Sequence, residues 1–102
     1  MNSLEIEIQL AKAKHVSITE DTMSVDLSDG RTISVPLAWF PRLVHGTQNE
    51  RERWRLIGQG EGIHWPDLDE DVSVANLILG KPSSENNRSL NRWLEERAKR
   101  NQ

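Results

Sequence analysis

The sequence contains no cysteine, and this absence excludes disulfide bonds, thiolate zinc sites and cysteine nucleophiles. It also lacks any run of about 20 apolar residues, the length that a membrane-spanning helix needs. The beginning of the chain alternates acidic and apolar residues, without the basic and then apolar pattern of a secretory signal. We therefore expect a cytoplasmic protein that does not contact membranes.

The sequence has no excess of positive charge either. Its 102 residues include 13 Lys and Arg against 16 Asp and Glu, a net charge of −3, whereas nucleic-acid-binding domains usually show a basic excess. Tyrosine is absent and phenylalanine occurs once, so four of the five aromatic residues are tryptophan. A chain of this length is one domain by default. The composition favours a single small domain without a general affinity for nucleic acid.

Alternation of apolar and polar residues predicts a three-stranded antiparallel meander over residues 15–35. Residues 23–27 show the pattern of a strand with one buried face. Asp29 and Gly30 follow, and an Asp-Gly pair between two alternating segments predicts a hairpin. We expect a type I′ turn there, in which both central residues have positive φ.

The next segment predicts short helices. Pro36 precedes residues 37–46 and Pro41 interrupts them, so we expect this segment to form a turn or a broken helix. Thr47 and Glu50 have the spacing of a capping box, in which each side chain bonds the backbone N–H of the other residue. This pattern predicts a helix over residues 48–54.

The second half of the chain predicts more strands and two helices. Strands are expected near residues 54–65, where glycines mark a bulge or a close backbone approach. Asp71 or Ser73 is expected to cap a helix whose apolar face carries Val74, Leu77 and Ile78. A last helix is expected over residues 84–99, with basic residues at its end, as the helix dipole favours.

These patterns predict an α+β fold in which a small antiparallel sheet packs with short helices. Residues 1–14 form an N-terminal tail or an edge strand. Residues 15–82 form a single α+β domain, and residues 83–102 form a C-terminal helical extension.

Two long segments carry a family resemblance. Residues 27–43 (LSDGRTISVPLAWFPRL) and residues 60–80 (GEGIHWPDLDEDVSVANLILG) closely resemble the bacterial family catalogued as domain of unknown function 2442. The resemblance covers roughly residues 15–82, and the tail SLNRWLEER is similar to an extension in the same subgroup. It implies a small sheet with helices, a prokaryotic cytosolic origin and no established reaction. It also implies an antitoxin-like role, because genes of this family often lie beside genes of another small uncharacterised family, as in toxin–antitoxin pairs.

The best candidate for a ligand site is the acidic segment 61–71. His64, Asp67, Asp69 and Asp71 offer one imidazole and several hard oxygen ligands to a divalent cation. The calcium-loop pattern breaks down, because the expected glycine and closing glutamate are absent. We therefore expect the acids to serve the start of the following helix, His64 to lie at the surface, and no catalytic residue, metal or cofactor. A small enzyme or ligand binder that uses His64 and the acids of residues 67–71 is the alternative hypothesis.

The last helix has a narrow apolar stripe of the kind that docks on a body or a partner. The stripe consists of Leu90, Trp93, Leu94 and Ala98, and our candidates for partner binding are Leu90, Trp93, Leu94 and Arg97. Trp93 docks either on its own domain or on a second chain. The leading hypothesis is a protein-interaction module whose partner is another protein or a second copy. An accessory nucleic-acid role for residues 83–102 is a further alternative, because five basic and three acidic side chains give this segment a net charge of +2.

Overall fold

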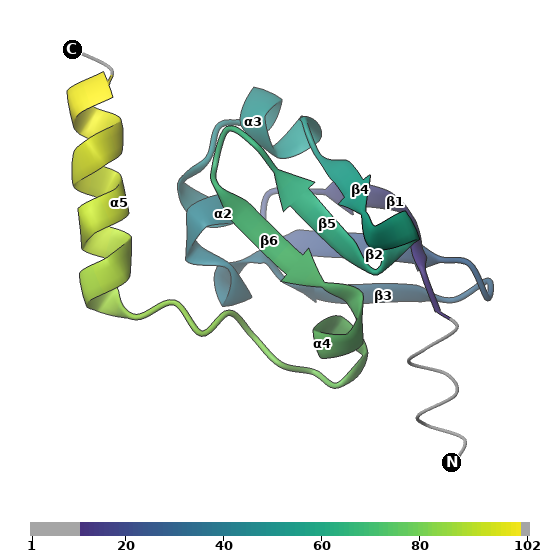
Figure 1. Cartoon of the computed structure of the whole chain (residues 1–102). Helices are drawn as coiled ribbons and strands as arrows, with labels where there is room; N and C mark the ends of the chain where they lie inside the picture. The colour runs from purple at the N-terminus through teal and green to yellow at the C-terminus, as the bar shows by residue number, and fades with distance from the viewer. Residues whose placement is uncertain (1–10, 101–102) are drawn as a thin grey trace.

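A computed structural model describes residues 11–100 and confirms the α+β class, with two small antiparallel sheets, short helices and a longer C-terminal helix (Figure 1). The molecule is elongated, with principal extents of 50 × 25 × 24 Å, because the C-terminal helix stands beside the sheets. We expected a tail or an edge strand over residues 1–14, of which residues 1–10 lie outside the described residues. Among residues 11–100, none of the helices has the length and apolar character that crossing a membrane requires.

The first sheet is the predicted meander, with strand order β1-β2-β3 and the bounds β1 Ala13–Ile18, β2 Thr22–Leu27 and β3 Thr32–Pro36. Val25 lies opposite Val16 on one side and Ile33 on the other, so apolar side chains share one face. β1 begins two residues earlier than expected. Its register shifts between Ala13 and His15, and this irregularity lets the buried Ala13 pair with β2.

The turn between β2 and β3 confirms the predicted hairpin, but the predicted turn type is wrong. Its loop is closed by the N–H of Leu27, which donates to the carbonyl of Arg31 at 2.8 Å. Only Gly30 has positive φ (+94°), whereas a type I′ turn requires two such residues. Asp29 accepts the backbone N–H of Arg31 at 3.0 Å. The Arg31 guanidinium, hydrogen-bonded to the same carboxylate, holds the pKa of Asp29 below its usual value.

Short helices connect the two sheets, with bounds η1 Leu37–Trp39, α2 Pro41–His45 and α3 Gln48–Glu52. The capping box is confirmed, because the Thr47 hydroxyl accepts the Glu50 N–H at 3.2 Å and the Glu50 carboxylate accepts the Thr47 N–H at 2.9 Å. α3 ends two residues earlier than expected, since Arg53 leaves helical geometry (φ −94°, ψ 68°).

The second sheet has strand order β4-β5-β6, with bounds β4 Arg55–Ile57, β5 Gly62–Trp65 and β6 Glu70–Ser73. β6 was not predicted, because we assigned its acids to the start of a helix. Asp71 instead pairs with His64 across the ladder, and only Ser73 caps the helix α4, Val74–Ile78. The Ser73 hydroxyl oxygen accepts the N–H of Asn76 at 3.3 Å. The prediction that the acids serve a helix start is therefore wrong for Asp71.

The two sheets meet at the turn η2, Gly58–Gly60. Gly60 has φ +95°, and a Cβ placed there would lie 2.7 Å from the carbonyl oxygen of Ala13. This contact confirms the predicted close backbone approach. Lys12 also forms an ion pair with Glu61 at 2.9 Å, so the first and second halves of the chain are joined at this point.

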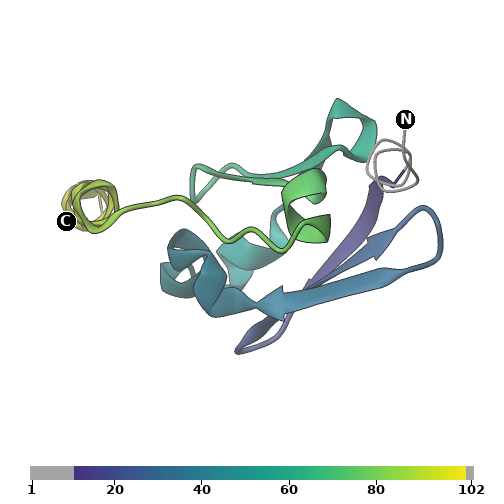
Figure 2. The ribbon, with the colours of Figure 1, turned by 90° about the horizontal axis from the view of Figure 1, so that it is seen from below.

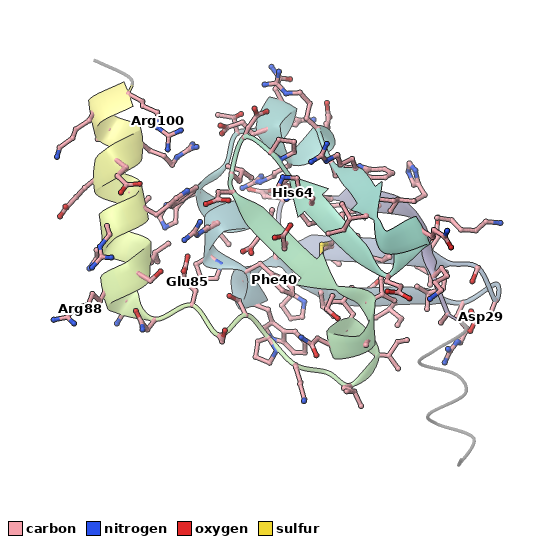
Figure 3. All side chains as sticks on the ribbon, in the orientation of Figure 1. Asp29, Phe40, His64, Glu85, Arg88 and Arg100 are labelled. Atoms are coloured by element: carbon pink, nitrogen blue, oxygen red, sulfur yellow. The ribbon has the colours of Figure 1, made fainter. Side chains whose placement is uncertain are left out.

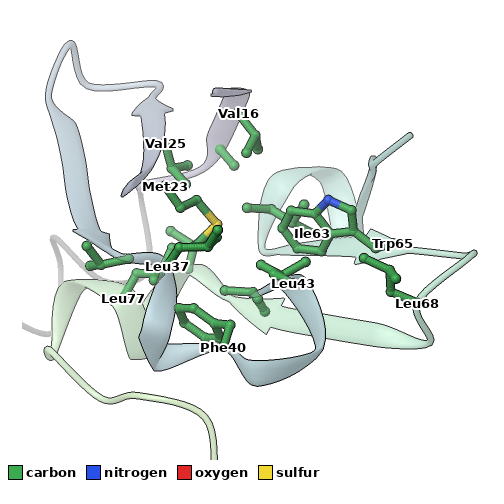
Figure 4. Packing of buried hydrophobic residues seen from close by; sticks show 14 of the residues in the cluster. Val16, Met23, Val25, Leu37, Phe40, Leu43, Ile63, Trp65, Leu68 and Leu77 are labelled. Atoms are coloured by element: carbon green, nitrogen blue, oxygen red, sulfur yellow. The ribbon is translucent and has the colours of Figure 1, made fainter. Parts of the chain in front are cut away.

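The core lies between the two sheets, which face one another as two layers (Figure 2). Met23 and Val25 enter it from the first sheet, and Ile63 and Trp65 enter it from the second (Figure 4). The indole N–H of Trp65 donates to the carbonyl of Arg51 at 2.9 Å, so its polar atom is satisfied although the residue is fully buried.

The C-terminal helix α5, Asn87–Arg100, follows an extended segment that runs along the body (Figure 1). It begins three residues later than the expected range of 84–99. Ser83 stays extended because its N–H donates to the carbonyl of Trp39 at 3.0 Å. The side chain of Asn86 then accepts the N–H of Ser89 at 2.8 Å, which is the bonding pattern of an N-cap.

Candidate functional site

Trp93 is the feature around which α5 docks. It is the one buried residue of that helix, at 5% exposure, and it belongs to the same buried cluster as the core. Two guanidinium groups lie over its ring: that of Arg97 at 4.7 Å from the ring centroid and that of Arg42, from α2, at 5.2 Å. Such cation–π contacts strengthen when water is excluded from them. α5 thus docks on its own chain through a tryptophan held by two cations.

Arg97 also joins α5 to α3. Its two terminal amino groups donate to the two carboxylate oxygens of Glu50 at 3.0 and 3.1 Å, and both side chains are less than one-fifth exposed. This bidentate bond lowers the pKa of Glu50 to about 2, with a further contribution from the Thr47 N–H. Glu50 therefore completes the capping box of α3 and holds α5 in place at the same time.

Arg42 forms the second ionic contact, at the beginning of α5. Its Nε and Nη2 donate to the carboxylate of Glu85 at 2.5 and 3.3 Å, and this pairing lowers the pKa of Glu85. The hydroxyl of Ser89 donates to the same carboxylate at 2.6 Å. Figure 3 shows Glu85 where the extended segment meets α5. The segment before α5 is therefore fixed to the body by Arg42, in addition to the backbone bond between Ser83 and Trp39.

The four partner-binding candidates of α5 lie on the side of the helix that faces the body. Trp93 is buried there, Arg97 is paired with Glu50, and Leu90 and Leu94 are half-buried against the core cluster. The docking site of Trp93 in this structure is its own chain. A partner that uses this stripe must therefore displace α5 from the body.

A polar groove of about 670 Å³ lies between β6 and the extended segment before α5. Arg42, Glu70, Ser83 and Glu85 are among its lining residues. Glu70 comes from the inner side of β6, and burial raises its pKa to about 6, although the charge of Arg42 acts in the opposite direction. Its carboxylate accepts the N–H of Asp71 at 3.0 Å.

The sequence-predicted ligand cluster does not assemble. His64 Nδ1 lies 2.5 Å from the carboxylate of Asp71 on the outer face of the second sheet, opposite the buried Ile63 and Trp65. Asp67 pairs with Arg53 at 2.8 Å, and Asp69 lies 3.5 Å from Arg42. In the part of the chain that the structure describes, no three His, Asp or Glu side chains converge as metal ligands. The structure brings together His64 and Asp71 alone.

Sequence reasoning missed the body side of the docking site, Arg42 and Glu50, and also Glu85 in the segment before α5, which pairs with Arg42. Glu50 was identified as a capping residue, and its second role carries no sequence signal, because its partner is 47 positions away. The sequence did show that α5 carries Arg97, a basic residue that could pair with an acid such as Glu50. Spacing along the chain does not reveal which residues of two separate helices are in contact.

The chain matches the family described as "Protein of unknown function (DUF2442)" over residues 13–83. None of the curated proteins matches it.

Two solved structures are similar. One is a crystal structure of a protein of unknown function from Rhodospirillum rubrum, with 26% identity, a TM-score of 0.63, and coverage of 74% of this chain and 93% of that one. The other is the solution structure of an uncharacterised protein from Chromobacterium violaceum, with 19% identity, a TM-score of 0.65, and coverage of 79% and 77%. The second likeness shows the fold alone. Because the family match spans more than half of its length, the chain belongs to the DUF2442 family of proteins of unknown function.

Proposed function

We propose that this chain is a protein-interaction module and that α5 is its recognition helix. The observation that carries the proposal is how α5 docks: one buried residue, Trp93, is held by two arginines, and the flanking contacts are ion pairs. Tryptophan and arginine are the residues that dominate binding energy at protein interfaces. A helix held in this way is suited to exchange between its own body and a partner.

The apolar stripe of α5 fits a helix-in-groove mode of recognition. Leu90, Trp93 and Leu94 are spaced three and one residues apart, so they lie on one side of the helix, and the two leucines are half-buried in the docked state. An amphipathic helix that enters a partner's groove presents anchors with this i, i+3, i+4 spacing. Release of α5 would expose all three side chains together.

The family resemblance supports one class of partner. Genes of this family often lie beside those of another small family, so the proposed partner is the small protein that is encoded next to this chain. In that arrangement the chain takes the antitoxin-like role and binds its neighbour rather than catalysing a reaction. The docked α5 is then the resting state, and the complex with the neighbour is the working state.

Co-expression and size-exclusion chromatography test the proposal. The wild-type chain should co-elute with the neighbouring protein, and Trp93→Ala should weaken the complex at least tenfold. Two separate peaks for the wild-type pair at micromolar concentration would refute binding to this neighbour.

A covalent lock tests the role of α5 separately. Because the chain has no cysteine, Glu50→Cys combined with Arg97→Cys can be joined by a short bis-maleimide. The locked double variant should bind the neighbour much more weakly than the same double variant treated with a monofunctional maleimide, so that the two samples differ only in the cross-link. Equal binding by the locked form would show that α5 does not need to leave the body.

A further inference from the structure

The two sheets have four outer edges, and three of them carry a feature that discourages further strand pairing. β3 ends at Pro36, which has no N–H to donate, and β4 is only three residues long. On β6, the inward-facing Glu70 carboxylate accepts the N–H of Asp71. β1 differs, because residues 15–18 form a regular edge without a proline or an inward-facing charge.

Backbone hydrogen bonds show which groups of β1 face outward. The N–H of Thr19 donates to the carbonyl of Thr22 at 2.9 Å, and hydrogen-bonded pairs alternate along an antiparallel ladder. Ser17 therefore bonds to β2, whereas the N–H and C=O groups of Val16 and Ile18 point away from it. Within residues 11–100, β1 has no second strand beside it, and no residue outside the β1–β2 ladder bonds these groups.

A groove of about 490 Å³ runs beside this edge. It is lined by residues 15–18 of β1 on one side and by Arg51, Glu52 and Trp54 on the other. The ring of Trp54 is half-buried and meets that of His15 edge-on, with centroids 5.5 Å apart. The groove therefore combines unpaired backbone groups with an aromatic wall, which suits an added strand.

The edge is complementary to itself. If two copies of β1 pair antiparallel about Ser17, then Val16 of each copy lies opposite Ile18 of the other, and both residues can exchange backbone hydrogen bonds. The same arrangement brings the basic start of the strand, at Lys14, toward the acidic turn after it, at Glu20. Parallel pairing would place like charges together. Such a contact uses the same patch on both copies, as a two-fold dimer requires.

We propose that β1 of one chain pairs antiparallel with β1 of a second copy about Ser17, so that two three-stranded sheets join into one sheet of six strands. Val16 and Ile18 of each copy contribute the paired backbone groups, and Trp54 covers the added strand. This dimer is independent of the proposed role of α5, because the contact lies on β1.

Sedimentation equilibrium of the full chain from 1 to 500 µM tests the proposal. The wild type should approach twice its monomer mass of 11.7 kDa. Ser17→Lys should raise the dimer dissociation constant at least tenfold, because it places two like charges at the two-fold axis on an exposed position. Its circular dichroism spectrum should match that of the wild type, which shows that the monomer still folds.

A charge exchange provides the matched control. Lys14→Glu and Glu20→Lys should each weaken the dimer about threefold or more, and the double variant should recover most of the loss. A monomer at every concentration would overturn the proposal. A dimer that tolerates Ser17→Lys would also overturn it, because the contact would then lie on another face.

Discussion

Glu50 and Arg97 form a bidentate ion pair in which both amino groups of the arginine meet both oxygens of the carboxylate, at 3.0 and 3.1 Å. The pair connects α3, which follows the first sheet, to α5 at the end of the chain. Because Glu50 also closes the capping box with Thr47, its carboxylate is preorganised before α5 docks. The docking site of α5 is thus part of the folded body.

Acid should release α5 through Glu50. The pKa of Glu50 is lowered from 4.5 to about 2. The stability that ionised Glu50 gives to the docked state is therefore complete above pH 4.5 and is lost as the pH falls from 4.5 toward 2. A shift of this size corresponds to up to about 3 kcal/mol. In NMR spectra recorded along this titration, the indole signal of Trp93 should move toward its exposed position. Glu50→Gln should reduce that acid transition to the part caused by Glu85, and an unchanged transition in the variant would contradict the assignment.

Trp93→Ala should undock α5 and leave the sheets folded. The side chain joins the core cluster but comes from a helix that follows an extended segment, so its loss removes one anchor and no strand. Hydrogen exchange should become much faster in α5 and stay slow in β2 and β5. Arg92→Ala, at an exposed neighbouring position of the helix, is the control and should leave α5 protected. Equally fast exchange throughout the sheets would show that α5 is integral to the core.

Glu70 should make folding stability depend on pH in the opposite direction to Glu50. Burial raises its pKa from 4.5 to about 6, so folding favours the protonated form. Stability is then greatest below pH 4.5 and falls as the pH rises through 6, by at most about 2 kcal/mol. Urea unfolding between pH 4.5 and 7 measures this slope, and Glu70→Gln should flatten it. A Gln variant with the wild-type slope would assign the effect to another group.

Gly60→Ala should be much more destabilising than Gly30→Ala. Both glycines have φ near +95°, so the backbone strain of an added side chain is similar at the two positions, on the order of 1 kcal/mol. A Cβ at Gly60 would also lie 2.7 Å from the Ala13 carbonyl, whereas one at Gly30 has no neighbour within 4 Å. Thermal unfolding of the two variants isolates this steric clash. Equal melting temperatures would mean that the backbones at Gly60 and Ala13 can move apart with little loss of folding free energy.

Local patterns predicted the first sheet, because its signals lie within a few residues of one another. The alternation in β2, the hairpin at Gly30 and the capping box of Thr47 each depend on neighbouring positions alone. β6 was missed because acids dominate its sequence, and its strand state depends on pairing with β5. Glu70 lies there on the inner face, where periodicity alone would place an apolar residue.

The docking site of α5 could not be predicted for a related reason. The sequence showed that Trp93 needed a partner surface, but the choice between its own body and a second chain depends on Arg42 and Glu50, which are distant in sequence. His64 was expected at the surface, and it lies on the outer face of β5, opposite the buried Trp65, because side chains alternate along a strand.

The contact between Gly60 and Ala13 has a consequence for synthesis on the ribosome. β1, β2 and β3 can pair as soon as they leave the exit tunnel, yet the rim of that sheet at Lys12 and Ala13 stays uncovered until Gly60 and Glu61 have also emerged. During that interval the nascent chain exposes the apolar face of the first sheet, because the second sheet has not yet been synthesised. We expect chaperones to bind the nascent chain at this stage.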